Sequence, residues 1–266
     1  MENSTHTESI FERFFKKELV VYRDGKYDIK NKNGDIISDE WEETWFQKGC
    51  PLVCVRKSDD SSNFVNCEGE YFSPRWFEDS HSIFSEGWTA VKLDGKWNFI
   101  NYDREYLSDQ WWDDCCPFSF GLAAVKKDDK WNYINKKLQF LCDEWFDEAY
   151  GFDKLTDDGL VFDIVKRDGK YNLINTRGEL IFDIWYDDFQ QVDYKKDEHD
   201  IGSFFMIRLK KDDKYNFVNE NLQIISDVWF DDADDTFYDG LCEVWLGSDF
   251  YLLDTNGILH PYEEEP

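Results

Sequence analysis

Pairs of adjacent acidic residues recur along the chain at the same place after a tryptophan. They are Glu78-Asp79, Asp113-Asp114, Asp147-Glu148, Asp187-Asp188 and Asp231-Asp232. Carboxylates gathered on one face could bind a basic protein surface, a cationic ligand or Ca²⁺. One pair alone is what a solvated turn after a buried strand would carry, because Asp is common in turns. Five pairs favour a shared acidic interaction face, since repeated like charge costs stability through self-repulsion.

Apart from the acidic pairs, the sequence shows no recognisable metal-binding or catalytic motif. The spacing of the acidic pairs matches no Ca²⁺-binding loop. The four histidines fall at unrelated places in the repeats described below, so nothing indicates converging metal ligands. Neither a Walker loop, nor G-x-S-x-G, nor H-E-x-x-H occurs. We therefore expect no enzyme activity, no catalytic or metal-binding residue and no cofactor.

The net charge of the chain limits the classes of molecule that it can bind. The 266 residues include 58 acidic and 30 basic side chains, and the formal net charge is −28. That balance opposes direct binding of nucleic acid or anionic lipid, which needs clustered Lys and Arg. A basic protein partner, a cation, or solubility alone remain as explanations.

Several absences predict a cytoplasmic protein. No stretch approaches the roughly 18 apolar residues of a membrane span, and the N-terminus lacks the basic and apolar regions of a secretory signal. The seven cysteines are odd in number and follow neither a disulfide framework nor a zinc-site spacing. Buried or half-buried thiols in a reducing compartment fit this usage better.

The elements that must position the acidic pairs belong to a repeated unit. An aromatic residue opens each unit, and a tryptophan follows fourteen positions later. The pairs are Tyr27/Trp41, Trp97/Trp111, Trp131/Trp145, Tyr171/Trp185 and Tyr215/Trp229, with a degraded copy that keeps Trp76 and a truncated one that starts at Phe250. The fixed separation predicts that these structural anchors pack in a core across neighbouring strands, rather than forming a stacking shelf for sugars or quaternary ammonium groups.

Each copy is expected to contain three strands. Asp94-Gly95 and Asp168-Gly169 lie between apolar runs, which predicts two-residue hairpins, and Asp128-Asp129 stands at the same place. The second strand should cover Trp131–Asn135, and the third should run through Phe140-Leu141 and Trp145-Phe146. Both faces of the sheet should then be covered by neighbours.

An asparagine recurs four positions after the first anchor. The set is Asn31, Asn66, Asn101, Asn135, Asn175 and Asn219, with Asp254 in the last copy. We expect an Asx turn in which the side chain accepts from backbone amides just ahead. A ladder of asparagines facing a ligand is the alternative.

Three segments interrupt or precede the copies. Residues 7–19 have helical spacing of Ile10, Phe11 and Phe14, although Ser9-Ile10-Phe11 also resembles the end of a copy. In either form, residues 1–18 are expected to cap one end of an array that spans residues 19–266. Residues 150–160 and 190–202 are the longer linkers, and the second, which is polar, is expected to be an exposed loop rather than a domain boundary.

The repeats resemble those of a known family. Gly-Leu-Ala-Ala-Val at 121–125, Asp94-Gly95-Lys96-Trp97 and the downstream Trp-Phe-Asp look like the WG (or KWG) repeat family, over about residues 19–259. Where that family usually has a glycine after the aromatic, this chain has Asn63, Asn98, Asn132, Asn172 and Asn216, with Asp28 and Tyr251 in the flanking copies. The resemblance implies a β-rich repeat array that acts as an interaction module and carries no catalytic residues.

Together these observations predict an all-β tandem repeat of about seven three-stranded β-hairpin modules. An open solenoid is favoured over a closed propeller or toroid, because the intervals between copies are uneven and the last copy lacks its third strand. The expected function is a non-enzymatic scaffold whose acidic face engages a basic protein partner, in a sharper version as a decoy of nucleic acid. The alternative is a receptor or sequestering protein that holds a small ligand between repeats.

Overall fold

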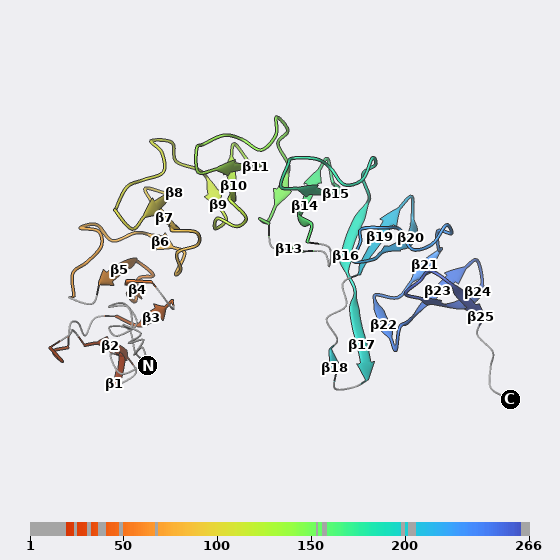
Figure 1. Cartoon of the computed structure of the whole chain (residues 1–266), viewed down its shortest axis with the longest axis horizontal. Coiled ribbons are helices and arrows are strands. Elements are labelled where there is room, and N and C mark those ends of the chain that lie inside the picture. Colours follow the sequence, from red (N-terminus) through yellow and green to blue (C-terminus); the bar gives the residue numbers. More distant parts are fainter. Residues whose placement is uncertain are drawn as a thin grey trace, which may run out of the picture. The chain divides into compact units, whose positions relative to one another are not determined.

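The computed structural model describes residues 20–23, 26–30, 33–36, 41–47, 50–66, 69–152, 154–155, 159–197, 200–201 and 206–261. Every helix or strand assigned in those ranges is a β-strand, which confirms the all-β class (Figure 1). The proposed cap, residues 1–18, lies outside them. Tyr27 lies on a described strand, but its side chain is not among those described.

The strands form seven sheets, most of them built around one antiparallel hairpin. In order of first strand, the sheets are β1 (Val20–Arg23) with β2 (Lys26–Ile29); β3 (Glu43–Phe46), β4 (Leu52–Arg56) and β5 (Ser62–Asn66); β6 (Asp79–Ser80), β7 (Trp88–Leu93) and β8 (Lys96–Asn101); β9 (Asp114–Cys115), β10 (Leu122–Lys127) and β11 (Lys130–Asn135); β12 (Glu148–Ala149), β13 (Lys154–Leu155), β14 (Val161–Arg167) and β15 (Lys170–Asn175); β16 (Asp188–Gln191), β19 (Ile207–Lys211) and β20 (Lys214–Val218); and β17 (Asp193–Asp197), β18 (Asp200–Ile201), β21 (Asp232–Ala233), β22 (Thr236–Tyr238), β23 (Leu241–Leu246), β24 (Asp249–Asp254) and β25 (Leu259–Pro261).

The hairpin turns follow the chemistry that the sequence predicts. Asp94 and Gly95 have φ of 50° and 75°, and Asp128 and Asp129 have φ of 50° and 62°. Positive φ at both central residues suits the right-handed twist of the flanking strands, and Asp and Gly tolerate it. The predicted two-residue hairpins are confirmed at these positions. The β4–β5 connection is longer, and the Lys57 amide donates to the Ser61 carbonyl at 2.9 Å.

The segment expected to form the third strand is instead a connector between two hairpins. Trp112 and Trp97 in β8 exchange two backbone hydrogen bonds of 2.8 Å, and then β9 pairs with β10 of the following hairpin. The corresponding connectors are residues 77–80, 112–115, 146–149, 186–189 and 230–233. The expected continuous strand through Phe140-Leu141 and Trp145-Phe146 is wrong, because Phe140 and Phe146 are isolated bridge residues and the residues between them are bends or have no regular structure.

The two linkers contain strands. Within 190–202, β17 pairs in parallel with β22 and antiparallel with β18. The loop prediction is wrong for these residues, because polar composition does not prevent a segment from pairing with an unoccupied strand edge. Within the linker 150–160, β13 pairs with β14.

The chain divides into two compact units. Unit 1 comprises residues 1–129 and 133–139, and unit 2 comprises residues 130–132 and 140–266. The dividing line therefore falls within β11. Each unit contains several hairpins and connectors of the same kind.

Aromatic rings contribute to the core of both units. In unit 1, Phe64, Phe72, Phe77 and Phe84 form one cluster, with the rings of Phe64 and Phe84 5.3 Å apart. In unit 2, a second cluster is built on Tyr186 and the strands β19 and β20. The rings and the aliphatic residues around them, such as Leu209 and Val218, together supply the apolar burial.

The tryptophan anchors lie at the border of this core. Trp76, Trp111, Trp145, Trp185 and Trp229 are half-buried, while the residues that follow them are exposed by 2% or less: Phe77, Trp112, Phe146, Tyr186 and Phe230. Each tryptophan can therefore pack on a ring of the preceding copy, as Trp229 stacks on Tyr186 at 6.1 Å. Among the first anchors, Trp97 is 8% exposed, and Trp131, Tyr171 and Tyr215 are half-buried.

Trp41 differs from the other tryptophans because it is completely buried. The Glu42 amide donates to the Arg56 carbonyl, just as the Glu78 amide donates to the Lys92 carbonyl. Trp41 thus occupies the position of Phe77. The fourteen-residue spacing places it one position out of register in this copy.

Candidate functional site

The first residue of each acidic pair joins two successive hairpins. Asp187 at the end of one copy accepts from Lys170 Nζ at 2.6 Å, and Lys170 begins the second hairpin strand of the same copy. Its other oxygen accepts from the Asp212 amide at 2.8 Å, in the next hairpin turn. Each carboxylate therefore closes a turn and holds a lysine beside it.

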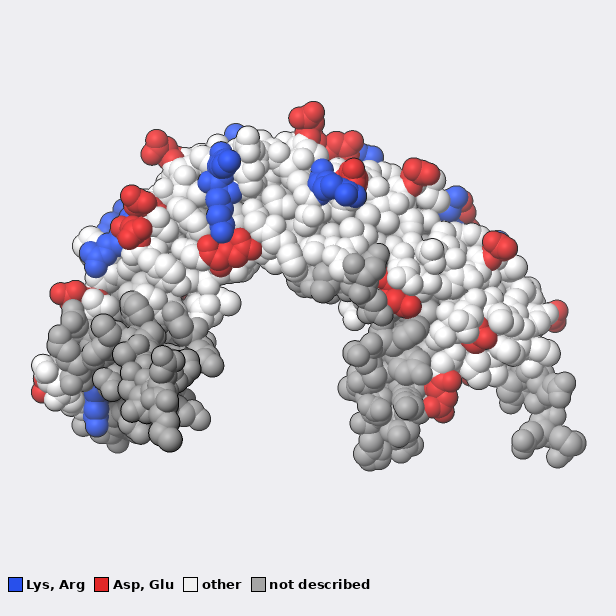
Figure 2. All heavy atoms as spheres, viewed as in Figure 1, with Lys and Arg blue, Asp and Glu red and all other residues white. Residues whose placement is uncertain are grey.

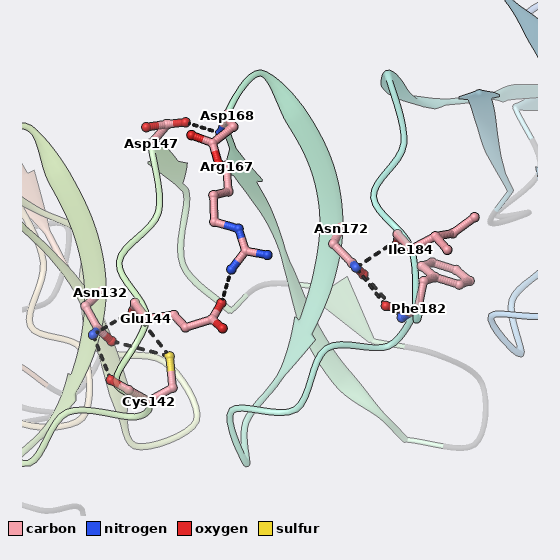
Figure 3. Close-up of polar contacts among 9 residues, drawn as sticks. All are labelled: Asn132, Cys142, Glu144, Asp147, Arg167, Asp168, Asn172, Phe182 and Ile184. Carbon is pink, nitrogen blue, oxygen red and sulfur yellow. Dashed lines mark hydrogen bonds and ion pairs between the residues drawn. The ribbon is translucent and has the colours of Figure 1, made fainter. Parts of the chain in front are cut away.

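The same double contact recurs in the other connectors. Asp113 contacts Lys96 and the Asp128 amide, Asp147 contacts Lys130 and the Asp168 amide, and Asp231 contacts Lys214 and the Gly247 amide. Figure 3 shows the contact of Asp147 with the backbone of Asp168. Glu78 accepts from the Gly95 amide at 3.0 Å.

These contacts favour the ionised carboxylate. Hydrogen bonding to Lys96 and to the Asp128 amide lowers the pKa of Asp113 below its ordinary value. The corresponding lysine, followed by the turn amide, lowers the pKa of Asp187 and of Asp231 in the same way. Asp113, Asp187 and Asp231 are therefore charged at neutral pH, and much of that charge is engaged within the molecule.

The second residue of each pair is placed differently. Asp114, Asp188 and Asp232 are exposed, and each accepts from the amide of the next residue at 2.9 to 3.0 Å. In the part of the chain that the structure describes, no Lys or Arg forms an ion pair with these three. Asp79 instead contacts Arg56 at 3.3 Å, and Glu148 contacts Lys166 at 2.8 Å.

A further set of exposed acids was missed from the sequence. Asp109, Asp143, Asp183 and Asp227 each stand two positions before a half-buried tryptophan, and all four are exposed. Their recurrence was visible in the sequence. Pro74 takes this position in the copy that contains Trp76.

Buried asparagines hold the turn segment that precedes each connector. Asn63, Asn98, Asn132, Asn172 and Asn216 have no exposed surface. Asn172 donates through Nδ2 to the carbonyls of Phe182 and Ile184 at 2.8 and 3.1 Å, and Asn132 makes the same contacts with Cys142 and Glu144 (Figure 3). These amides take the place of strand-to-strand hydrogen bonds. The sequence showed the recurrence but gave no sign of this function.

The other recurring asparagines form the Asx turns that the sequence predicts. Asn101 Oδ1 accepts from the amides of Asp103 and Glu105 at 3.0 and 2.9 Å, and Asn175 and Asp254 make the same pair of contacts in their copies. The capping role is confirmed at these positions. It occupies the side-chain oxygen with local backbone.

Cationic side chains cover the exposed faces of two anchor tryptophans. Lys57 Nζ lies 4.0 Å from the centre of the Trp76 ring, and Arg167 lies 4.3 Å from that of Trp185. Arg167 also pairs with Glu144 (Figure 3). Such cation–π contacts leave little free ring surface at these two positions.

The cysteines are poorly placed for nucleophilic chemistry. Burial raises the pKa of Cys54 to about 11, and burial also raises the pKa of Cys50, Cys115 and Cys242. These thiols are therefore protonated at neutral pH, and the thiol is the weaker nucleophile. Over the residues that the structure describes, no group of three or more His, Cys, Asp or Glu side chains could hold a metal ion.

Charged groups of both signs share the visible surface. On the face shown in Figure 2, Asp and Glu alternate with Lys and Arg, rather than forming one continuous acidic area.

The described residues also include no helix long and apolar enough to span a membrane.

Neither a protein-family model nor a curated protein matches the chain. Among solved structures, it is similar to BamB from Moraxella catarrhalis at 11% identity, with 90% of this chain and 80% of that chain covered and a TM-score of 0.39. Hsv2 from Kluyveromyces lactis is similar at 11% identity, with coverage of 93% and 95% and a TM-score of 0.40. A eukaryotic initiation factor is similar at 11% identity, with coverage of 90% and 72% and a TM-score of 0.44. At these TM-scores the likeness assigns neither a closed ring nor a function.

Proposed function

We propose that the chain is a non-enzymatic interaction scaffold whose exposed acids engage the basic surface of a partner protein. The observation that carries the proposal is the difference within the acidic pairs. In four pairs the first acid is held by a lysine and a turn amide, whereas Asp114, Asp188 and Asp232 are exposed and, among the residues that the structure describes, bond only the adjacent backbone. Charge complementarity of this kind selects partners and speeds association.

The overall charge supports the same function. With 58 acidic and 30 basic residues, a one-to-one pairing of every Lys and Arg would still leave 28 acids without a basic counterpart. Retaining so much like charge costs stability. An external basic surface offsets that cost when it binds.

Neighbouring residues of equal charge provide a matched test. The variant Asp188→Asn/Asp232→Asn removes two exposed acids, and Asp187→Asn/Asp231→Asn removes two acids that close turns. We expect the first variant to weaken binding of a lysine-rich peptide about two- to fivefold per acid, with a melting temperature that does not fall. The second should lower the melting temperature.

Salt dependence decides whether the contact is electrostatic. Binding of the lysine-rich peptide should weaken at least about tenfold between low and high ionic strength, because screening acts on exposed charges. Binding that is insensitive to salt, or equally affected by both double variants, contradicts the proposal.

A sharper form of the proposal is a decoy of nucleic acid. Carboxylates presented at the surface can occupy the basic groove of a nucleic-acid-binding protein. In that case, duplex DNA should displace the partner from the chain in competition binding. A partner that binds the chain and duplex DNA at once excludes the decoy.

We also propose that the modules belong to a WG-like repeat array in open form, within the reducing cytoplasm. Uneven intervals between copies support the open form. The expectation that the last copy lacks its third strand is wrong, because β25 pairs with β24. The buried thiols support the compartment. Small-angle X-ray scattering tests the form, since a closed ring of the same mass has a smaller maximum dimension than an open array.

A further inference from the structure

A pocket of about 390 Å³ lies where the copy with Trp76 meets the copy with Trp111, within unit 1. Its lining includes Phe72, Leu93, Ile100, Tyr106 and Trp111. Phe72, Leu93 and Ile100 form buried walls, while Tyr106 is 41% exposed and lies against Trp111, with ring centres 5.3 Å apart. The size and the apolar lining suit a small organic ligand.

The pocket is also cationic, which is unusual in a chain of this charge. Arg75 and Arg104 both line it. Arg75 contacts Asp94 at 3.4 Å, but the side chains are 63% and 82% exposed, so this ion pair holds the guanidinium weakly. Arg104 lies 5.7 Å from the centre of the Phe72 ring.

Corresponding grooves in other copies show that this charge is specific to one place. Two positions before the tryptophan, Pro74 replaces the acid found at Asp109, Asp143, Asp183 and Asp227. One position before it, Arg75 replaces Gln110, Glu144, Ile184 or Val228. The corresponding pocket in unit 2 has about 270 Å³ and contains Asp143 and Glu144 instead.

Arg104 takes a backbone conformation that disfavours it. Its φ is 69°, and the same turn position holds Gly69, Gly178 and Gly257 in other copies. Leu138 and Leu222 show that a side chain is tolerated there at a cost. A strained residue that adds charge to a pocket indicates a binding role rather than a folding role.

The ring of Trp111, beside the arginines, lacks the cation that covers the corresponding tryptophan in two other copies. Lys57 covers Trp76 and Arg167 covers Trp185. Next to Trp111, the hairpin residue that corresponds to Lys57 and Arg167 is Leu93. In this copy the positive charge lies at the edge of the pocket and not over the tryptophan ring. An anion from solution can contact it there.

We propose that this pocket binds a small ligand with a flat aromatic body and one anionic group. The body would lie against Trp111, Tyr106 and Phe72, and the anion would bind Arg75 and Arg104. Carboxylate and phosphate are both anions that guanidinium groups bind in a bidentate manner. The site is distinct from the connectors and does not depend on the proposed acidic face.

Calorimetric titration with three probes tests the site on the full chain. Naphthalene-2-carboxylate and naphthyl phosphate share a ring and differ in the anion, and naphthalene-2-carboxamide is neutral. We expect at least one anion to bind with a Kd below about 1 mM and the amide to bind at least about tenfold more weakly. The arms with carboxylate and phosphate show which anion the site prefers.

Two variants and one control complete the test. Arg75→Gln and Arg104→Gly should each weaken binding of the anion about tenfold. Arg104→Gly restores the glycine of other copies and should fold at least as well as the original chain. Arg177→Gln removes an equally exposed arginine from a turn in unit 2 and should leave binding unchanged. No binding of either anion at that concentration, equal binding of the amide, or unaffected binding in both variants overturns the proposal.

Discussion

Asn172 satisfies four backbone groups from one buried side chain. Its Oδ1 accepts from the amides of Leu173 and Phe182 at 2.7 and 3.2 Å, and its Nδ2 donates to the carbonyls of Phe182 and Ile184. Those groups have no neighbouring strand to pair with at this point. A buried polar group left without a partner is costly, so the amide should be important for stability.

Replacing this amide tests its contribution. We expect Asn172→Ala to lower the free energy of unfolding by about 3 kcal/mol, because several backbone groups lose their partner in a buried place. Asn219→Ala removes two hydrogen bonds in a half-buried Asx turn and should cost only about 1 kcal/mol. Urea unfolding of both variants measures the difference, and equal losses contradict this role for Asn172.

The stability of the folded chain at acid pH should depend on the first acid of each pair, such as Asp187. Lys170 and the Asp212 amide lower the pKa of Asp187 in the folded chain, relative to about 3.9 in the unfolded chain. A lowered folded pKa gives stability that is fully present above the unfolded pKa and is lost as the pH falls through the folded pKa.

Asp187→Asn should therefore be less stable than the original chain near neutral pH, and the gap should close in acid. Urea unfolding at several pH values from about 6 to about 2 measures this convergence. Asp188→Asn is the matched control, because no lysine among the described residues holds that carboxylate. If the difference in stability between the variant and the original chain stays constant with pH, Asp187 contributes through its shape and not through its charge.

Which acid of a pair is free could not be predicted from the sequence. The lysine that holds Asp187 stands seventeen residues before it, and the amide lies in the next hairpin. Both partners are brought there by the fold. The Asx turns were predictable, because Asn101 and the amides it caps lie within four residues.

At the scale of elements, local turn chemistry made the hairpins predictable. Asp94-Gly95 determines its own backbone conformation, so the turn could be assigned without its neighbours. The connector could not be assigned in the same way. Its strand pairs with a hairpin of the following copy, and that pairing partner is not indicated by the local pattern of aromatic residues.

Turn glycines should differ in their tolerance of a side chain. A Cβ at Gly257 would lie 1.7 Å from the Ile225 carbonyl oxygen, whereas a Cβ at Gly169 would meet nothing within 4 Å. Both have positive φ, so alanine costs about 1 kcal/mol of backbone strain at either. Gly257→Ala should therefore lower the melting temperature clearly more than Gly169→Ala in a thermal scan. Equal effects would mean that the turn after Asp254 does not approach Ile225 closely.

For the whole molecule, the charge of −28 should make stability depend on salt. Screening weakens the repulsion among surplus acids more than it weakens the fewer ion pairs. We expect the melting temperature to rise by about 2–5 °C between low salt and about 0.5 M NaCl. The variant Asp114→Asn/Asp188→Asn/Asp232→Asn should gain less over the same range. A melting temperature that falls with salt would show that the ion pairs outweigh the repulsion.

The connectors have a consequence for how such a chain can lengthen or shorten. Each copy gives its short strand to the next hairpin and receives one from the copy before, as β9 does for β10. An in-frame duplication or loss of one whole copy leaves every short strand inside the array with a hairpin to pair with. Only the outermost hairpins are affected by the change. We therefore expect a chain with one whole copy added or removed to pair its short strands in the same way.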